Sequence, residues 1–183
     1  KRILNRGDGE LFEVDDLGFQ IGPRINARSR MTEPFAALRY LLAENDEISY
    51  KELFSLNENN NERKLKEQQM LIKADAEALK QIALGYKALI IFDKDFHPGV
   101  QGIVASRLVD KFGRPAVVFS PMGEDKCSGS ARTISSVHIR DALERVYILN
   151  PDLLLSFGGH QGAAGLKIPK DKLNDFSKIF NQV

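Results

Sequence analysis

The sequence predicts an α/β protein in which a helical part precedes a small α/β domain with a mixed, largely buried sheet and helices packed on it. Apolar residues recur at helical spacing in the first half, and no convincing buried strand precedes about residue 88. From there, short apolar runs alternate with amphipathic segments, as in a sheet covered by helices. We therefore divide the chain into a helical segment, residues 1–86, and an α/β domain, residues 87–183.

The helical segment is expected to contain two helices, over residues 32–44 and about 49–86. One stripe of the second helix carries its apolar residues, which are Leu65, Ile72, Ala76, Leu79, Ala83 and Tyr86. Extended backwards, the stripe meets Asn61 and Asn57. Either the run NENNNERK is a solvated break between two shorter helices, or the asparagines interrupt a buried seam for a purpose.

The α/β domain is expected to alternate strands and helices. Strands are predicted at residues 88–92, 114–120, 152–157 and 165–168, and helices at residues 99–112, 135–146 and 170–180. The apolar character of these strands indicates a mainly buried sheet.

Composition limits the function more than it defines it. With 26 Lys and Arg against 25 Asp and Glu, the net charge of +1 excludes the strongly basic class of nucleic-acid coating proteins, so any phosphate binding must be local. One cysteine, Cys127, excludes an internal disulfide, and no apolar run could span a bilayer. We expect a cytoplasmic protein with no membrane partner. The charged start without methionine suggests a piece of a longer chain.

The segment GPRINARSRM, residues 22–31, is the first candidate for anion binding. Arg24, Arg28 and Arg30 lie around Asn26 in a loop that we expect just before a helix. Arginine guanidinium groups match phosphate oxygens bidentately, and an asparagine adds a neutral donor. The alternative is that these arginines are merely solvated.

The segment SGSARTISS, residues 128–136, is the second candidate. Small and hydroxyl-bearing residues surround its one cation, Arg132, in what we expect to be a loop. Such a loop can present backbone N–H groups and side-chain donors to an anion. A plain turn remains the alternative, because short loops of serine and glycine are common.

The segment FGGHQGAAG, residues 157–165, is the third candidate. Gly158 and Gly159 follow an expected strand, and the carboxyl ends of strands are where open α/β sheets bind ligands. His160 is either a ligand of substrate or a histidine satisfied within a tight turn. His97 and His138 are weaker candidates, and Asp93 and Asp95 beside His97 resemble a metal set that no further cluster supports.

Taken together and in order, these segments resemble the carboxyl-terminal half of the catalytic core of the RecJ family. The resemblance rests on LGFQIGPRINARSRM, LNENNNERKLKEQ, FHPGVQGIVASRLVDKFGRPAVVFS, SGSARTISSVHIRDALERV and FGGHQGAAG, from about Leu17 to the end. The family comprises single-stranded-DNA-specific exonucleases of the DHH phosphoesterase superfamily. The GGHxxAAG pattern by itself indicates only a DHH-associated domain.

The resemblance implies roles for particular residues. It makes Ser130 and Arg132 binders of a substrate phosphate, that of the 5′ end, and makes His160 a substrate ligand in a glycine turn with Gly158 and Gly159. It also implies that further side chains line the same cleft, namely Arg24, Asn26 and Arg30. The chain departs from the family pattern at Arg28 and Ser29, where a small residue and a glycine are usual, and at Phe96, where tryptophan is usual.

The resemblance further implies 5′ to 3′ digestion of single-stranded DNA in DNA repair and recombination. Catalysis would use divalent metal, manganese or magnesium, held by an amino-terminal DHH domain that has no counterpart here. This chain would hold no metal and be inactive alone, and its helical segment would be the connector between domains. Implied partners are single-stranded DNA, that DHH domain, a single-strand-binding protein and a recombination helicase.

Two other functions remain open on the sequence. One is a phosphodiesterase of the same superfamily that acts on short oligonucleotides or cyclic dinucleotides. The other is a noncatalytic nucleotide-binding module.

Overall fold

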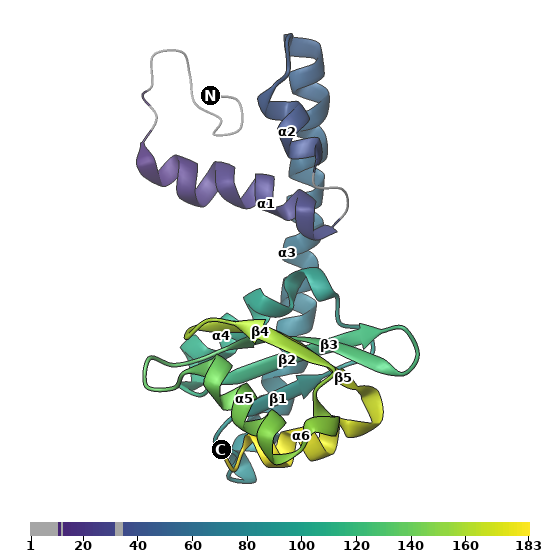
Figure 1. Cartoon of the computed structure of the whole chain (residues 1–183). Helices are drawn as coiled ribbons and strands as arrows, with labels where there is room; N and C mark the ends of the chain where they lie inside the picture. Colours follow the sequence, from purple (N-terminus) through teal and green to yellow (C-terminus); the bar gives the residue numbers. More distant parts are fainter. Residues whose placement is uncertain (1–10, 12, 32–34) are drawn as a thin grey trace. The chain divides into compact units, whose positions relative to one another are not determined.

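The computed structural model describes residues 11, 13–31 and 35–183, and it divides into two units, Lys1–Lys66 and Glu67–Val183 (Figure 1). Helices make up the described part of the first unit, whereas the second is a mixed sheet with helices on its faces. The predicted fold class is confirmed. Within the described residues, not even the 38-residue helix α3 is apolar enough along its length to cross a membrane.

The first unit contains a π-helical turn, Asp16–Ile21, followed by α1 (Gly22–Met31), α2 (Phe35–Leu41) and the start of α3 (Asp46–Ala83). The expected loop of arginines at residues 22–31 is therefore wrong, because these residues form α1. Helical backbone continues from the π-helical turn through Pro23 into α1, and Ala27 provides a buried contact. Arginine is itself a good helix former.

Helix α3 is continuous through the run NENNNERK, so the solvated break does not occur. Asn59 and Asn60 are buried, whereas Asn57 is half-buried and Asn61 is exposed. Asn59 donates from Nδ2 to the carbonyl of Ser55 at 2.6 Å, a bond within the helix that satisfies the buried amide.

The apolar stripe predicted on α3 is not its buried face. Leu65, Ile72 and Leu79 are 59%, 66% and 57% exposed. In the second unit the buried residues of α3 are instead Met70, Ala74 and Ala78, at steps of four. The prediction failed because helical spacing shows that apolar residues share a face but not which face meets the rest of the unit, and the alanines of the predicted stripe are exposed as well.

The sheet has five strands in the order β1-β2-β3-β5-β4. Strands β1 (Leu89–Phe92) and β2 (Ala116–Met122) are parallel, and β3 (Lys126–Arg132), β5 (Ala163–Pro169) and β4 (Ser156–Gly159) add antiparallel neighbours. The expected loop over residues 128–136 is therefore wrong in its first half, which belongs to β3. Gly129 suits that strand because a Cβ there would lie 2.5 Å from the Phe119 ring.

The expected strand at residues 152–157 is displaced. Pro151–Leu153 form a short 3-10 turn that buries Leu153 in the core, and β4 begins only at Ser156. Gly158 and Gly159 consequently lie inside a strand rather than after it.

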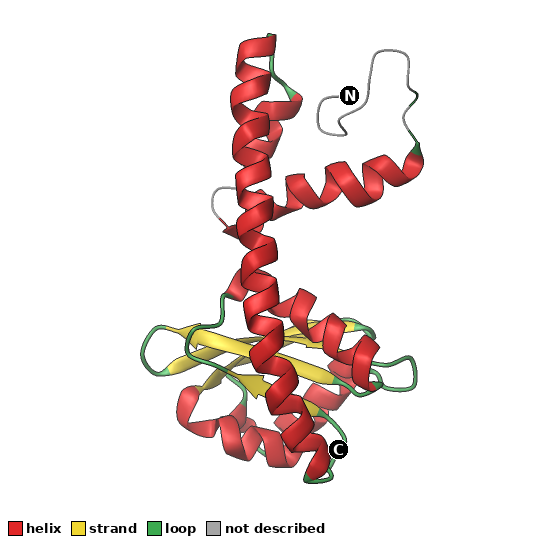
Figure 2. Cartoon of the chain, turned by 180° about the vertical axis from the view of Figure 1, so that it is seen from behind, coloured by secondary structure: helices red, strands yellow, loops and turns green. Residues whose placement is uncertain are grey.

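Helices cover the two faces of the sheet unequally. On one face, α5 (Ile139–Leu149) and α6 (Leu173–Phe180) pack on the main core, where the Phe119 and Phe176 rings meet edge to face at 5.6 Å. On the other face lie α4 (Gln101–Phe112), which contacts β2 and β3, and the second part of α3 (Figure 2). There β4 and β5 expose Gly158, Gly165 and Lys167. A polar strip of sheet is thus left open beside α4.

One side-chain amide bonds the backbone of β1 on the side away from β2, and a second bonds the two residues just before the strand. Gln81 of α3 accepts from the Ile90 N–H at 2.9 Å and donates to the Ile90 carbonyl at 2.7 Å. Asn181, just after α6, accepts from the N–H groups of Lys87 and Ala88 at 2.8 Å each. These amides provide the hydrogen bonds that a neighbouring strand would otherwise make.

We predict that Gln81→Leu destabilises the protein by about 1 to 3 kcal/mol, because it leaves the Ile90 N–H and carbonyl groups without partners in a partly buried place. Urea unfolding followed by circular dichroism measures the change. Gln69→Leu is the matched control, since Gln69 lies on the same helix with an exposed side chain. Equal stability of the two variants would contradict the prediction.

Candidate functional site

Strand β3 presents Ser128, Ser130 and Arg132 on the open face, alternating with the buried Cys127, Gly129 and Ala131. This alternation follows from the strand repeat of two residues. Arg132 donates from Nη1 to the Ser130 hydroxyl oxygen at 3.1 Å and to the Ala131 carbonyl at 2.7 Å. The Arg132 guanidinium is therefore held beside the Ser130 hydroxyl. Both groups can donate hydrogen bonds, and an anion could accept from both at once.

The first turn of α4 lies against these two side chains. A Cβ on Gly102 would be 2.7 Å from Nη2 of Arg132 and 3.0 Å from the Ser130 hydroxyl oxygen. The buried Gln101 fixes this turn, because its Nε2 donates to the Ser120 hydroxyl at 2.6 Å and the Ser128 carbonyl at 2.7 Å. The residue before the helix, Val100, supplies no side-chain cap. The positive end of α4, which favours anions, thus meets the guanidinium.

Two glycines continue the row that begins at Ser130, one on β5 and one on β4, and we call Gly165 and Gly158 the glycine floor. Ser130 pairs with Gly165, and Gly165 pairs with Gly158. Directly paired residues point to the same face, so all three share the open face. A Cβ at Gly158 or at Gly165 would have no atom within 4 Å. The backbone is therefore bare here, and a ligand can approach it closely.

Gly159 has a structural role that Gly158 lacks. Its φ is +154°, and a Cβ would lie 2.3 Å from the Ala163 carbonyl oxygen and 2.6 Å from the Ala164 Cα. The chain can therefore make this approach only with glycine.

His160 lies in the turn between β4 and β5. Its backbone N–H donates to the Ala163 carbonyl at 2.9 Å, and its exposed ring accepts at Nδ1 from the Gly162 N–H at 3.2 Å. A neutral ring that accepts at Nδ1 carries its proton on Nε2. His160 therefore closes the turn, which is one of the two roles predicted for it.

The arginine segment belongs to the first unit. Arg24 donates from Nε to Asn57 Oδ1 at 2.8 Å and from Nη1 to the Gln20 carbonyl at 2.7 Å. Asn57 on the long helix thus orients Arg24, which gives this half-buried asparagine a purpose. Asn26 and Arg30 are exposed on α1. Within the second unit, the structure brings together Ser130, Arg132 and the glycine floor.

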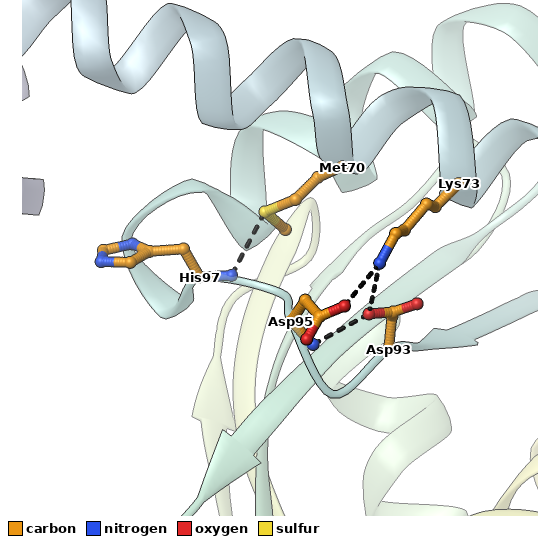
Figure 3. A network of polar contacts seen from close by, with 5 residues as sticks. All are labelled: Met70, Lys73, Asp93, Asp95 and His97. Atoms are coloured by element: carbon orange, nitrogen blue, oxygen red, sulfur yellow. Dashed lines mark hydrogen bonds and ion pairs between the residues drawn. The ribbon is translucent and has the colours of Figure 1, made fainter.

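The carboxylates near His97 are bound by a lysine (Figure 3). Lys73 of α3 contacts Asp93 at 3.0 Å and Asp95 at 2.8 Å. The hydrogen bond from Lys73 lowers the pKa of Asp95, and the hydrogen bond to Asp95 raises the pKa of Lys73. His97 points away and caps the turn at residues 98–100 through Nδ1. The described residues contain no group of three potential metal-binding side chains.

Sequence reasoning missed two residues of the site, Gln101 and Gly102. A signal was present, because a glycine inside an otherwise helical segment costs stability and marks a close approach. What it approaches cannot be read from the segment itself. His138 was predicted to lie at the start of a helix, and it does cap α5, by accepting from the Asp141 N–H at 3.3 Å.

Residues 84–183 match the DHHA1 domain family. The chain belongs to that family. This DHHA1 protein is 40% identical to the single-stranded-DNA-specific exonuclease RecJ of Haemophilus influenzae, over 98% of this chain and 32% of that protein. It is 37% identical to the RecJ of Escherichia coli, over 99% of this chain and 32% of that protein.

Solved structures agree with these relatives. RecJ of Thermus thermophilus in complex with Mg²⁺ superposes with a TM-score of 0.82 and 31% identity, over 99% of this chain and 27% of that chain. The resemblance to RecJ is therefore confirmed. The DHHA1 protein spans about a third of the length of the curated relatives it matches.

We predict that Gly159→Ala and Gly158→Ala differ in stability although the two residues are neighbours. The Gly159 variant should lose about 1 to 3 kcal/mol, because its side chain meets backbone at an unfavourable φ. The Gly158 variant, whose Cβ enters open space, is its matched control and should unfold at the wild-type midpoint. Thermal unfolding of both variants tests this, and a stable Gly159 variant would show that the turn relaxes.

Proposed function

We propose that this chain is the substrate-binding part of a RecJ-like exonuclease that digests single-stranded DNA from 5′ to 3′. The observation that carries the proposal is the placement of the Arg132 guanidinium and the Ser130 hydroxyl against the first turn of α4, beside the glycine floor. A guanidinium, a hydroxyl and the positive end of a helix form a site for a phosphate.

The phosphate at this site is, in the proposal, the terminal phosphate of the strand's 5′ end. The glycine floor lets the terminal nucleotide lie close to the sheet, since no side chain rises from Gly158 or Gly165. His160 would donate from Nε2 to that nucleotide. We propose Arg24, Asn26 and Arg30 as further contacts of the same strand.

The residues of this site do not suit a divalent metal, because a cation, a hydroxyl and a histidine without carboxylates are a poor set of ligands for Mn²⁺ or Mg²⁺. Hydrolysis would therefore depend on a metal held by another domain, the DHH domain of the same protein. Solved RecJ structures in complex with Mg²⁺ and with Mn²⁺ support the use of a divalent metal by the full enzyme. This chain contributes positioning and neutralisation of phosphate charge.

The biological setting is part of the same proposal. We place the protein in DNA repair and recombination in the cytoplasm, where a single-strand-binding protein and a recombination helicase would supply or unwind its substrate.

We expect Arg132→Ala to weaken binding of a 5′-phosphorylated single strand by about 1.5 to 3 kcal/mol, through the loss of a charge-assisted contact. Digestion of such strands by the full-length enzyme is the measurement, and the unfolding midpoint should stay nearly unchanged. Arg140→Ala is the matched control, because Arg140 is an exposed residue of α5, paired with Glu144. Unaltered digestion by the Arg132 variant would refute the phosphate assignment.

A further test uses the 183-residue chain by itself. It should bind a 5′-phosphorylated strand weakly, because a net charge of +1 gives little long-range attraction. Binding should weaken with salt, by roughly 0.7 in the logarithmic slope for each phosphate neutralised. It should hydrolyse nothing, whereas the full-length protein with Mn²⁺ should digest the same strand. Metal-dependent nuclease activity of the purified chain would overturn the division of roles and direct attention to Asp93 and Asp95.

A further inference from the structure

We infer that Gly102 is the positioning residue of the phosphate site: its lack of a side chain determines where the Arg132 guanidinium lies. The inference rests on the proposed function, because it assigns a second residue to the same phosphate. Gly102 makes no contact of its own with substrate in this account. It acts through Arg132 and Ser130, which occupy the space that a larger residue would need.

Glycine is an unfavourable choice at this position for the helix alone. Gly102 is the second residue of the 12-residue helix α4, where alanine would lower the backbone entropy cost. The backbone does not demand glycine either, since its φ lies outside the left-handed region. A reason for glycine must therefore come from its neighbours.

Those neighbours are the two proposed phosphate binders. The three heavy atoms nearest to a Cβ at Gly102 are Nη2 of Arg132 at 2.7 Å, the Ser130 hydroxyl oxygen at 3.0 Å and Cζ of Arg132 at 3.3 Å. None of the three is a backbone atom. This distinguishes Gly102 from Gly159, which faces backbone atoms. Gly129 also faces side chains, but these are the apolar Phe119 ring and Leu166, whereas Gly102 faces polar groups.

A side chain at position 102 should therefore impair substrate binding without lowering the stability of the fold. A methyl group at position 102 would meet the far end of a long side chain, which can move to another rotamer while the backbone stays in place. The fold would survive with every donor still present, but the guanidinium would leave its place beside the Ser130 hydroxyl. Arginine binds phosphate through a directional fork, so a displaced guanidinium loses most of its contribution.

The experiment compares Gly102→Ala, Arg132→Ala and the double variant in the full-length enzyme. Substrates are single strands identical except for a 5′-phosphate or a 5′-hydroxyl. We expect Gly102→Ala to raise KM for 5′-phosphorylated strands about ten- to a hundredfold, with kcat nearly unchanged. KM for 5′-hydroxyl strands should change less than about twofold, because the terminal phosphate is absent. The unfolding midpoint should equal or exceed that of the wild type.

The double variant tests whether Gly102→Ala raises KM by displacing Arg132. If Gly102 acts through Arg132, then Gly102→Ala should add less than about a twofold change in KM to the Arg132→Ala enzyme. Additive effects, or an equal loss on both substrates with a lowered unfolding midpoint, would overturn the inference and indicate a general packing role.

The two proposals fail in different ways. A normal KM in Arg132→Ala would refute the phosphate site itself, and the inference about Gly102 would fall with it. A normal KM in Gly102→Ala together with a raised KM in Arg132→Ala would refute only the role of Gly102.

Discussion

The close approach of α4 to β3 is the constraint on which the open face of the sheet depends. Gln101 binds β2 and β3 through the Ser120 hydroxyl and the Ser128 carbonyl, and Gly102 leaves beside the helix the space that the Arg132 and Ser130 side chains occupy. With the helix held there, β4 and β5 remain uncovered beside it. The positive end of α4 thus lies beside the Arg132 guanidinium, and the exposed glycines of β4 and β5 lie next to it.

The sequence supported the α/β order and the helices with strong apolar periodicity, among them α5 and α6. It failed where tertiary contacts override local preference. β3 contains few strong strand formers, and it is a strand because it pairs with β2 on one side and β5 on the other. Its Gly129, which does not favour strands, is there because a larger residue would collide with the Phe119 ring. On α3 two faces carry apolar residues, and only packing against the rest of the unit decides that the face with Ala74 and Ala78 is the buried one.

The candidate site was predictable in part. Ser130, Arg132, Gly158 and His160 were identified from motifs, since short segments rich in glycine, hydroxyl groups and arginine keep their chemical character in any fold. Their arrangement depends on register, which places Ser130, Gly165 and Gly158 in one row. Register follows from pairings distant in sequence, so no local pattern shows it. Asn57 illustrates the same limit, because its partner Arg24 lies 33 residues away.

The amides of Gln81 and Asn181 on β1 have a consequence for how the protein behaves in solution. Unpaired strand edges are where sheets of different molecules join and aggregate. Gln81 occupies the backbone groups of Ile90 at the edge of β1, and β4 forms the opposite edge of the sheet. That strand is four residues long and ends in two glycines, which makes it a poor template for another strand. The exposed polar surface beside α4 therefore adjoins an edge strand that is poorly suited to pair with a strand of another molecule.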